Sequence, residues 1–181
     1  GGTLGMLAGY HGRWIDTVIS RIIYIFLALP FLLGAIVFLT VIKIYNVWTI
    51  SAVLIILSWT IIARIMRGSV LAAKEEPYVE AARALGYGHA RVALFHVLPN
   101  VLGPVVVYAT LQVGRNVILA ASLSFLGLGP QPPTPDWGQM LSTGRTALAI
   151  AAHVATIPGI AIVLLSIGFK GTEPASSSPA A

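Results

Sequence analysis

The chain alternates between long apolar stretches and shorter polar ones. Four apolar stretches are each close to the roughly 20 residues with which an α-helix crosses about 30 Å of hydrocarbon. We expect each to be a complete transmembrane helix; the stretches are residues 22–42, 47–63, 101–121 and 147–169. Residues 1–10 are apolar but too short to cross a membrane. The pattern therefore predicts an all-α, polytopic transmembrane helical bundle.

The connecting segments are polar or rich in helix breakers. Residues 11–21 carry three charges and predict a loop. Pro30 is expected to kink the first span, since proline removes a helical hydrogen bond. Residues 123–146 are rich in Gly, Pro and Ser and predict a partly ordered loop. The Pro/Ser/Ala-rich residues 171–181 predict a disordered tail.

The longest polar interruption runs from Arg64 to Asn100, between two membrane-length apolar runs. Such a segment is expected to lie outside the hydrocarbon. Pro77 suits the first turn of a helix, where no backbone N–H is needed. The expected helix has an apolar face formed by three residues at i, i+4 and i+7, which are Tyr78, Ala82 and Leu85.

Gly86 predicts the end of this helix, because glycine is common one residue past a helix terminus. A second short helix is expected from His89 to Val97, ending at Leu98–Pro99. The pattern thus predicts two short helices joined by a glycine turn at the membrane surface.

Basic residues set the expected orientation, because loops rich in Lys and Arg face the cytoplasm. Lys43 and Arg145 fall on one side of the four predicted spans. Eight basic residues fall on the other: Arg13, Arg21, Arg64, Arg67, Lys74, Arg83, Arg91 and Lys170. We therefore expect residues 64–100 in the cytoplasm and residues 122–146 outside.

Composition supports a membrane protein. The chain is 57% hydrophobic and only 9% charged, against about 25% charged residues in soluble domains. The net charge of +5 is explained by basic loops, so no nucleic-acid partner is expected. The chain has no cysteine, which excludes disulfides and thiolate metal sites. It begins at Gly1, and we interpret it as a fragment whose N-terminal part is missing.

The sequence lacks the patterns of several chemistries. It contains no His-Glu-x-x-His zinc motif, no Gly-x-Ser-x-Gly and no Gly-x4-Gly-Lys-Ser/Thr phosphate loop. We interpret His153, in the fourth predicted span, as a packed polar residue. No acidic residue lies in a predicted span, where a proton-coupled carrier would place one. We predict no catalytic, cofactor or metal site on this chain. If transport is driven by ATP, we expect a partner subunit to bind it.

Three motifs in order resemble a known family. They are Tyr78–Gly86 (YVEAARALG), His96–Asn100 (HVLPN) and Ser122–Gly129 (SLSFLGLG) followed by Pro135–Gly138 (PDWG). The likeness extends from about Gly5 to Phe169. The chain resembles the inner-membrane permeases of ABC importers that carry an EAA loop, in particular those of the dipeptide/oligopeptide/nickel group.

The resemblance implies a type I ABC importer permease domain (MetI-like) over residues 1–170, with a cytoplasmic coupling segment at 67–99. It implies that this segment docks on a separate ABC ATPase through Glu80, Ala81, Ala82, Gly86, Leu98 and Pro99. The expected partners are that ATPase, a second permease subunit, an extracytoplasmic solute-binding protein and membrane lipid. The expected location is the bacterial inner membrane, with peptides or similar solutes as cargo. The alternative is a stand-alone channel or carrier whose cytoplasmic helix only lies at the interface.

Three polar residues in the third predicted span are candidates for the pathway: Gln112, Arg115 and Asn116. An intramembrane charge indicates function by default. Arg115, however, lies about 22 Å along the helix from Asn100 at 1.5 Å per residue, where an arginine can also snorkel to the outer interface. Both interpretations stay open.

Overall fold

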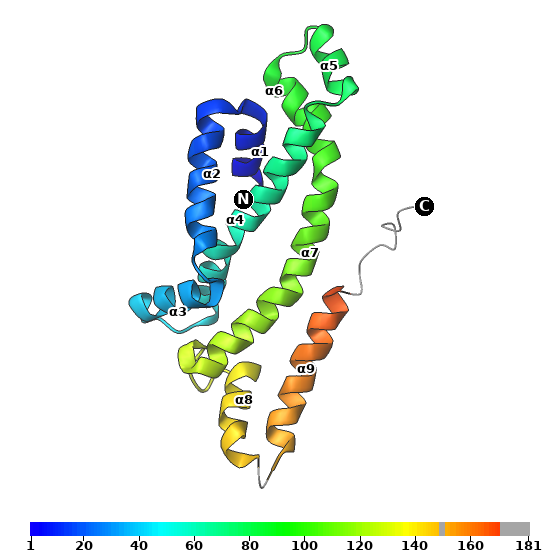
Figure 1. Ribbon diagram of the computed structural model, residues 1–181. Coiled ribbons are helices and arrows are strands. Elements are labelled where there is room, and N and C mark those ends of the chain that lie inside the picture. The colour runs from blue at the N-terminus through cyan, green and yellow to red at the C-terminus, as the bar shows by residue number, and fades with distance from the viewer. Residues whose placement is uncertain (149–150, 171–181) are drawn as a thin grey trace. The chain divides into compact units, whose positions relative to one another are not determined.

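The computed structural model describes residues 1–148 and 151–170 (Figure 1). Within them every regular element is helical, which confirms the all-α prediction. The elements are α1 (Gly2–His11), α2 (Arg13–Ala28), α3 (Phe31–Ile42), α4 (Val47–Ala73), α5 (Pro77–Ala84), α6 (His89–Arg91), the π-helix η1 (Val92–Val97), α7 (Leu98–Leu123), the π-helix η2 (Ser124–Leu128), α8 (Trp137–Gly144), the 3₁₀ turn η3 (Arg145–Ala147) and α9 (His153–Lys170).

Two compact units make up the chain. The first comprises residues 1–31 and 55–109, and the second comprises residues 32–54 and the chain from Thr110 onward. Both α4 and α7 contribute one end to each unit. The segment expected to be cytoplasmic, with α5, α6 and η1, belongs entirely to the first unit.

In the first unit, α1 packs directly on the backbone of α4. A Cβ atom at Gly5 would collide with the carbonyl oxygen of Ala63, and one at Gly9 would lie 2.8 Å from Cβ of Val70. Only glycine permits this approach of one helix to another. The N-terminal apolar segment is therefore a packed helix, although it is too short to span a membrane.

The predicted loop at residues 11–21 is wrong, because α2 begins at Arg13. Arg13 and Arg21 are exposed on this helix, whereas Asp16 lies on the same side as Ile23, which is 2% exposed. An amphipathic helix accommodates charges on its outer face, so they do not by themselves indicate a loop.

The first predicted span is interrupted rather than kinked. Helix α2 ends at Ala28, and α3 begins at Phe31. Leu29 is extended, with φ −82° and ψ 127°, because the ring of Pro30 disfavours helical geometry in the residue before it. Residues 22–42 thus form parts of a bent helix pair.

Helix α4 starts at Val47, where the predicted second span starts, but it continues through Arg64 to Ala73. Its 27 residues correspond to about 40 Å, which exceeds the roughly 30 Å of hydrocarbon. The beginning of the polar interruption is therefore an extension of the span.

In the second unit, α8 and α9 lie side by side (Figure 1). The carboxylate Oδ2 of Asp136 accepts a hydrogen bond from the backbone N–H of Gln139 at 3.0 Å, which caps α8. The hydroxyl of Ser166 on α9 donates to the carbonyl oxygen of Gly114 on α7 at 3.2 Å. The predicted loop at 123–146 is therefore largely helical.

The described residues contain two helices that are long and apolar enough to span a membrane, Val47–Ala73 and His89–Leu128, or three if the bent pair forms one span. The apolar part of α9, His153–Phe169, is shorter. This is fewer than the four complete spans that hydropathy predicts. The length and apolar character of these helices nonetheless indicate a membrane protein. The predicted tail at 171–181 lies outside the described residues.

Candidate functional site

Helix α5 begins at Pro77, as predicted, with the extended Glu76 as its N-cap. The inward side chains of the helix are Val79 and Ala82, which are 0% and 4% exposed. The predicted apolar face is confirmed at Ala82 and wrong at Tyr78 and Leu85, which are 38% and 75% exposed. Tyr78 and Val79 are adjacent and both apolar, so periodicity alone could not choose between the two neighbouring stripes.

The outward face of α5 carries Glu80, Ala81 and Arg83, all of them exposed. Of the two alanines assigned to ATPase coupling, only Ala81 presents its side chain outward. Ala82 packs inside the chain. The structure thus separates a polar outward face from the small, buried inward face.

Gly86 ends α5 with a left-handed turn. Its φ is 81°, and the backbone N–H groups of Gly86 and Tyr87 donate to the carbonyls of Arg83 and Ala82 at 2.9 and 3.3 Å. This pair of bonds is the Schellman arrangement that closes a helix. A Cβ at Gly86 would meet nothing within 4 Å, so the backbone conformation alone requires glycine. The predicted glycine stop is confirmed.

The second helix does not end at Leu98–Pro99 as predicted. From His89 the helix continues through Leu98 and Pro99 as far as Gly127, where the backbone leaves helical geometry with φ 83°. Between Val92 and Val97 it is π-helical, and the backbone N–H of Leu98 donates to the carbonyl of Ala93. Pro99 has no N–H to donate, and next to it Nδ2 of Asn100 donates to the carbonyl of His96 at 2.7 Å. The wider π register lets the helix pass through the proline.

A buried apolar core lies beneath the segment. Val79 and Ala82 of α5 and Val92 and Val97 of η1 pack in one cluster with residues of α1, α4 and α7, which are Met6, Met66, Val70, Ala73, Val101 and Val105. The α5–turn–η1 segment is thus fixed to three other helices through its inner face. Its exposed outer face is held in a defined position.

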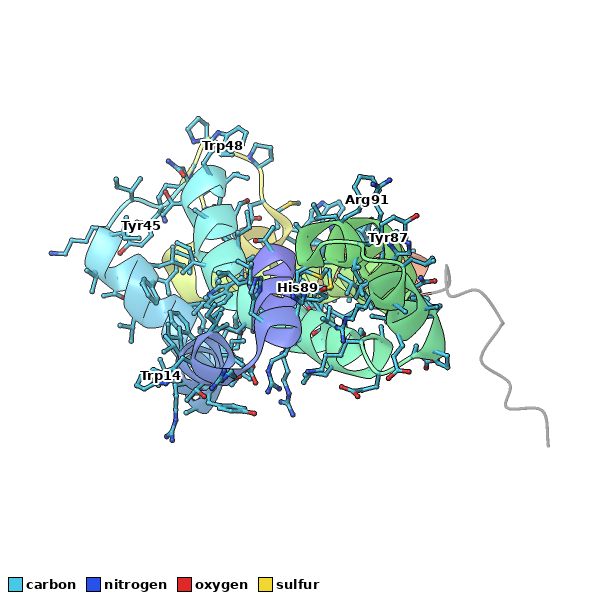
Figure 2. The ribbon with its side chains drawn as sticks, turned by 90° about the horizontal axis from the view of Figure 1, so that it is seen from above. Trp14, Tyr45, Trp48, Tyr87, His89 and Arg91 are labelled. Carbon is cyan, nitrogen blue, oxygen red and sulfur yellow. The ribbon has the colours of Figure 1, made fainter. Side chains whose placement is uncertain are left out.

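An aromatic and cationic cluster follows the glycine turn, and our sequence analysis did not predict it. The guanidinium carbon of Arg91 lies 4.8 Å from the ring centroid of Tyr87. The ring of His96 lies 5.6 Å from the same ring. Figure 2 shows Tyr87 and Arg91 beside each other on this segment. The i, i+4 spacing of Tyr87 and Arg91 was a usable signal, whereas the approach of His96 depends on the π-helix.

A second interaction that the sequence did not reveal joins α2 to α4. The guanidinium of Arg67 donates through Nε and Nη2 to the two carboxylate oxygens of Asp16, the Nη2 bond being 2.7 Å long. Both side chains are largely shielded, at 26% and 21% exposed. The bidentate geometry makes this pair stronger than a single surface salt bridge.

The candidate pathway residues lie on the part of α7 that belongs to the second unit. Gln112 is buried, and its Nε2 donates to Oδ1 of Asn116 at 3.3 Å. Arg115 is exposed. The structure brings Gln112 and Asn116 together, and the role of all three in the pathway stays a prediction.

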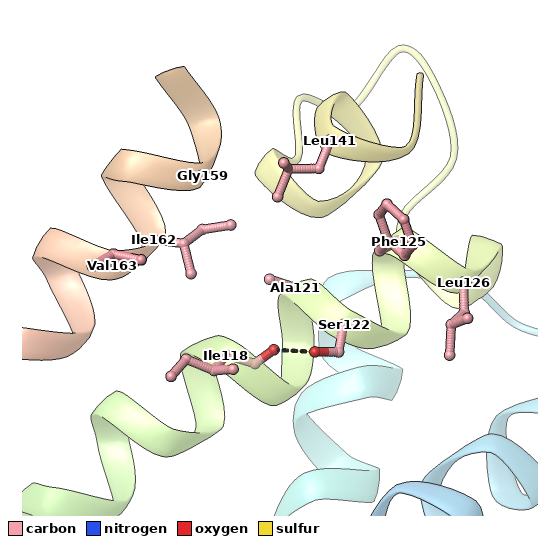
Figure 3. Close-up of a pocket in the computed structure, with 9 residues that line it drawn as sticks. All are labelled: Ile118, Ala121, Ser122, Phe125, Leu126, Leu141, Gly159, Ile162 and Val163. Carbon is pink, nitrogen blue, oxygen red and sulfur yellow. Dashed lines mark hydrogen bonds between the residues drawn. The ribbon is translucent and has the colours of Figure 1, made fainter. Parts of the chain in front are cut away.

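The second unit also contains an apolar pocket of about 450 Å³. Ile118, Phe125, Leu141 and Ile162 are among its lining residues (Figure 3). Its Ser122 hydroxyl donates to the carbonyl of Ile118 at 2.8 Å. The pocket therefore offers mainly hydrocarbon to an occupant and no titratable side chain. Across residues 1–148 and 151–170, no group of three potential metal ligands gathers.

Residues 1–169 match the family of the binding-protein-dependent transport system inner membrane component. The chain belongs to this family. It is 42% identical over 170 residues to the dipeptide transport system permease protein DppC of Alkalihalophilus pseudofirmus, in a match covering 94% of this chain and 56% of that protein. It is 41% identical over 170 residues to the glutathione transport system permease protein GsiD of Pectobacterium atrosepticum, with the same coverage.

Membership of the binding-protein-dependent transport family confirms the resemblance that the EAA-like motif indicated. The chain spans about half the length of the curated relatives it matches. Those relatives are permeases of transport systems, so a stand-alone channel or carrier has less support than a permease component.

Proposed function

We propose that this chain is the permease subunit of an ATP-driven importer in the bacterial inner membrane. With a second permease subunit it forms the pathway for peptides or similar small solutes. A separate ABC ATPase supplies the energy, and an extracytoplasmic binding protein delivers the solute. The family match and the names of the relatives support this proposal.

The observation that carries the proposal is the division of α5 into two faces. Val79 and Ala82 face the shared core, whereas Glu80 and Ala81 are exposed. A helix that only lay on lipid would turn its apolar face toward the membrane and its polar face to water. Here Val79 and Ala82 are covered by the chain's own helices, while Tyr78 and Leu85 stay exposed beside the polar residues. The outward polar face is available to a protein partner, and Ala81 would let that partner approach closely.

The proposal is tested by co-purification of ABC ATPases with this chain from the cells that produce it. Glu80→Lys reverses one charge on the outward face and is expected to lower ATPase recovery by about tenfold, as loss of a charge contact of roughly 1.4 kcal/mol would. Glu75→Lys is the matched control, because it makes the same change at an exposed site before α5. It should leave recovery within about twofold of wild type.

Two results would contradict the proposal. One is normal ATPase association and normal solute uptake in Glu80→Lys. The other is sustained uptake by this chain alone in liposomes under a pH gradient, which would favour the stand-alone carrier.

A further inference from the structure

A hollow of about 550 Å³ lies on the outer side of the helix that leads into α7. Its lining residues come from the glycine turn, α6 and η1: Tyr87, Ala90, Arg91, Leu94, Phe95 and His96. None of these six is acidic. The hollow is separate from the outward face of α5, to which the proposed ATPase contact is assigned.

One end of the hollow is built to receive an anion. Arg91 presents an exposed guanidinium held against the Tyr87 ring. His96 packs on that ring too, and its Nδ1 atom is buried without a hydrogen-bond partner. Arginine, tyrosine and histidine can all donate hydrogen bonds. A phosphate group fits this set because it brings several acceptor oxygens and negative charge.

The π-helix explains why these groups converge. Arg91 and His96 are five residues apart, which in an α-helix would place them on different faces. The π register of Val92–Val97 closes hydrogen bonds from i to i+5 and so aligns residues five apart. Both side chains therefore meet the same Tyr87 ring.

The other end of the hollow is apolar and exposed. Leu94 and Phe95 are 54% and 72% exposed, and Phe95 lies about 6 Å further along the helix axis than Arg91 at 1.5 Å per residue. The apolar surface continues into α7 with Leu102 and Val106, which are 41% and 56% exposed. Charge thus gives way to hydrocarbon along the axis, in the order in which a phospholipid presents its headgroup and acyl chain.

The length of the helix places this transition at the membrane boundary. The segment from His89 to Leu128 is helical up to Gly127, and at 1.5 Å per residue this helix is nearly twice as long as the roughly 30 Å of hydrocarbon is thick. Because the first turns carry the exposed charge of Arg91, we place them beyond the acyl region, where exposed aromatic and basic side chains meet lipid headgroups.

We propose that this hollow is a binding site for an anionic phospholipid. The phosphate contacts Arg91 and Tyr87, with His96 packed behind the tyrosine ring, and an acyl chain lies along Phe95, Leu102 and Val106. The lipid anchors the start of α7 at the membrane surface. This site is independent of ATPase docking and does not rest on the proposed function.

The test uses the full chain in phosphatidylcholine vesicles with traces of spin-labelled phosphatidylglycerol or spin-labelled phosphatidylcholine. Electron paramagnetic resonance measures the fraction of each lipid that the protein immobilises. Wild type should prefer phosphatidylglycerol, and Arg91→Gln should lower that preference about fivefold, as expected for one basic residue at the surface. Arg83→Gln is the matched control, since it removes an exposed cation of the same segment outside the hollow, and it should retain the preference.

Phe95→Ser provides a second variant, which should weaken retention of both labelled lipids while the preference between them persists. Circular dichroism of each variant checks that the helices remain. An unchanged preference in Arg91→Gln would overturn the proposal. So would displacement of the labelled lipid by inorganic phosphate, which would indicate a site for free phosphate. Loss of ATPase co-purification in Arg91→Gln without any change in lipid preference would assign the hollow to a protein partner instead.

Discussion

Arg67 and Asp16 lie 51 positions apart in the sequence, and their side chains form a bidentate ion pair that joins α4 to α2. Each is mostly shielded from water. The pair fixes α2 to the part of α4 that extends toward the segment carrying α5.

Breaking this pair should destabilise the first unit. Asp16→Asn is expected to lower the free energy of unfolding by about 1–2 kcal/mol, because hydrogen bonds to charged groups contribute on that order. Denaturation in detergent micelles, followed by circular dichroism, measures the change. Arg64→Gln, at an exposed position on the same helix, should have little effect. The double variant Asp16→Asn/Arg67→Gln tests the coupling of the two side chains. If its loss in free energy of unfolding equalled the sum of the losses in the two single variants, the side chains would not be coupled.

Basic-residue asymmetry predicts that residues 64–100 and 122–146 face opposite sides of the membrane. His89→Cys and Gln131→Cys introduce single thiols into a chain that has no cysteine. A membrane-impermeant maleimide applied to intact cells should label position 131 and spare position 89 until the cells are opened. Labelling of both positions from the same side would contradict the predicted topology.

The left-handed turn should tolerate only residues that accept a positive φ. Gly86→Val places a β-branched side chain at φ 81°, which is expected to cost about 1–3 kcal/mol. Gly86→Asn should be milder, since asparagine visits this region more readily. Gly88→Val is the control, because Gly88 has φ −64° and open space at its Cβ. Equal losses of thermal stability in the two valine variants would contradict the prediction.

The neighbouring alanines of α5 should respond differently to enlargement. Ala82→Leu forces a larger side chain into a packed core and should lower stability by about 1–3 kcal/mol. Ala81→Leu adds the same atoms on the exposed face and should leave stability nearly unchanged. Under the proposed function, Ala81→Leu should instead reduce ATPase co-purification. Thermal unfolding and co-purification of the two variants in parallel separate the effects.

Local sequence rules predicted the ends of α5 well. Pro77 and Gly86 determine backbone geometry through their own φ preferences, independently of any distant neighbour. The start of α4 at Val47 was likewise visible, because the uncharged run begins there.

The prolines show where local rules fail. Pro30 was expected to kink a helix and instead separates two, whereas Pro99 was expected to end a helix that continues through it. The difference depends on whether neighbouring backbone groups can adjust, as the π turn before Pro99 does. That adjustment depends on packing, which sequence spacing does not record.

The contacts that complete the candidate site are tertiary. Asp16 finds Arg67 across 51 positions, and His96 reaches Tyr87 only because η1 is π-helical. Neither arrangement leaves a periodic signal. The inward face of α5 was not predicted for a related reason. Tyr78 and Val79 are adjacent, and each begins an equally regular helical series of apolar residues.

The shared core under α5 determines how the protein responds to mechanical load. Val79 and Ala82 interlock with side chains of α4 and of the helix entering α7, and protein interiors are close-packed and scarcely compressible. A force applied at Glu80 or Ala81 is therefore divided between two membrane-entering helices. We therefore expect α5 to move together with the ends of these helices that share its core, and the tight turn at Gly86 to transmit such a force without acting as a hinge.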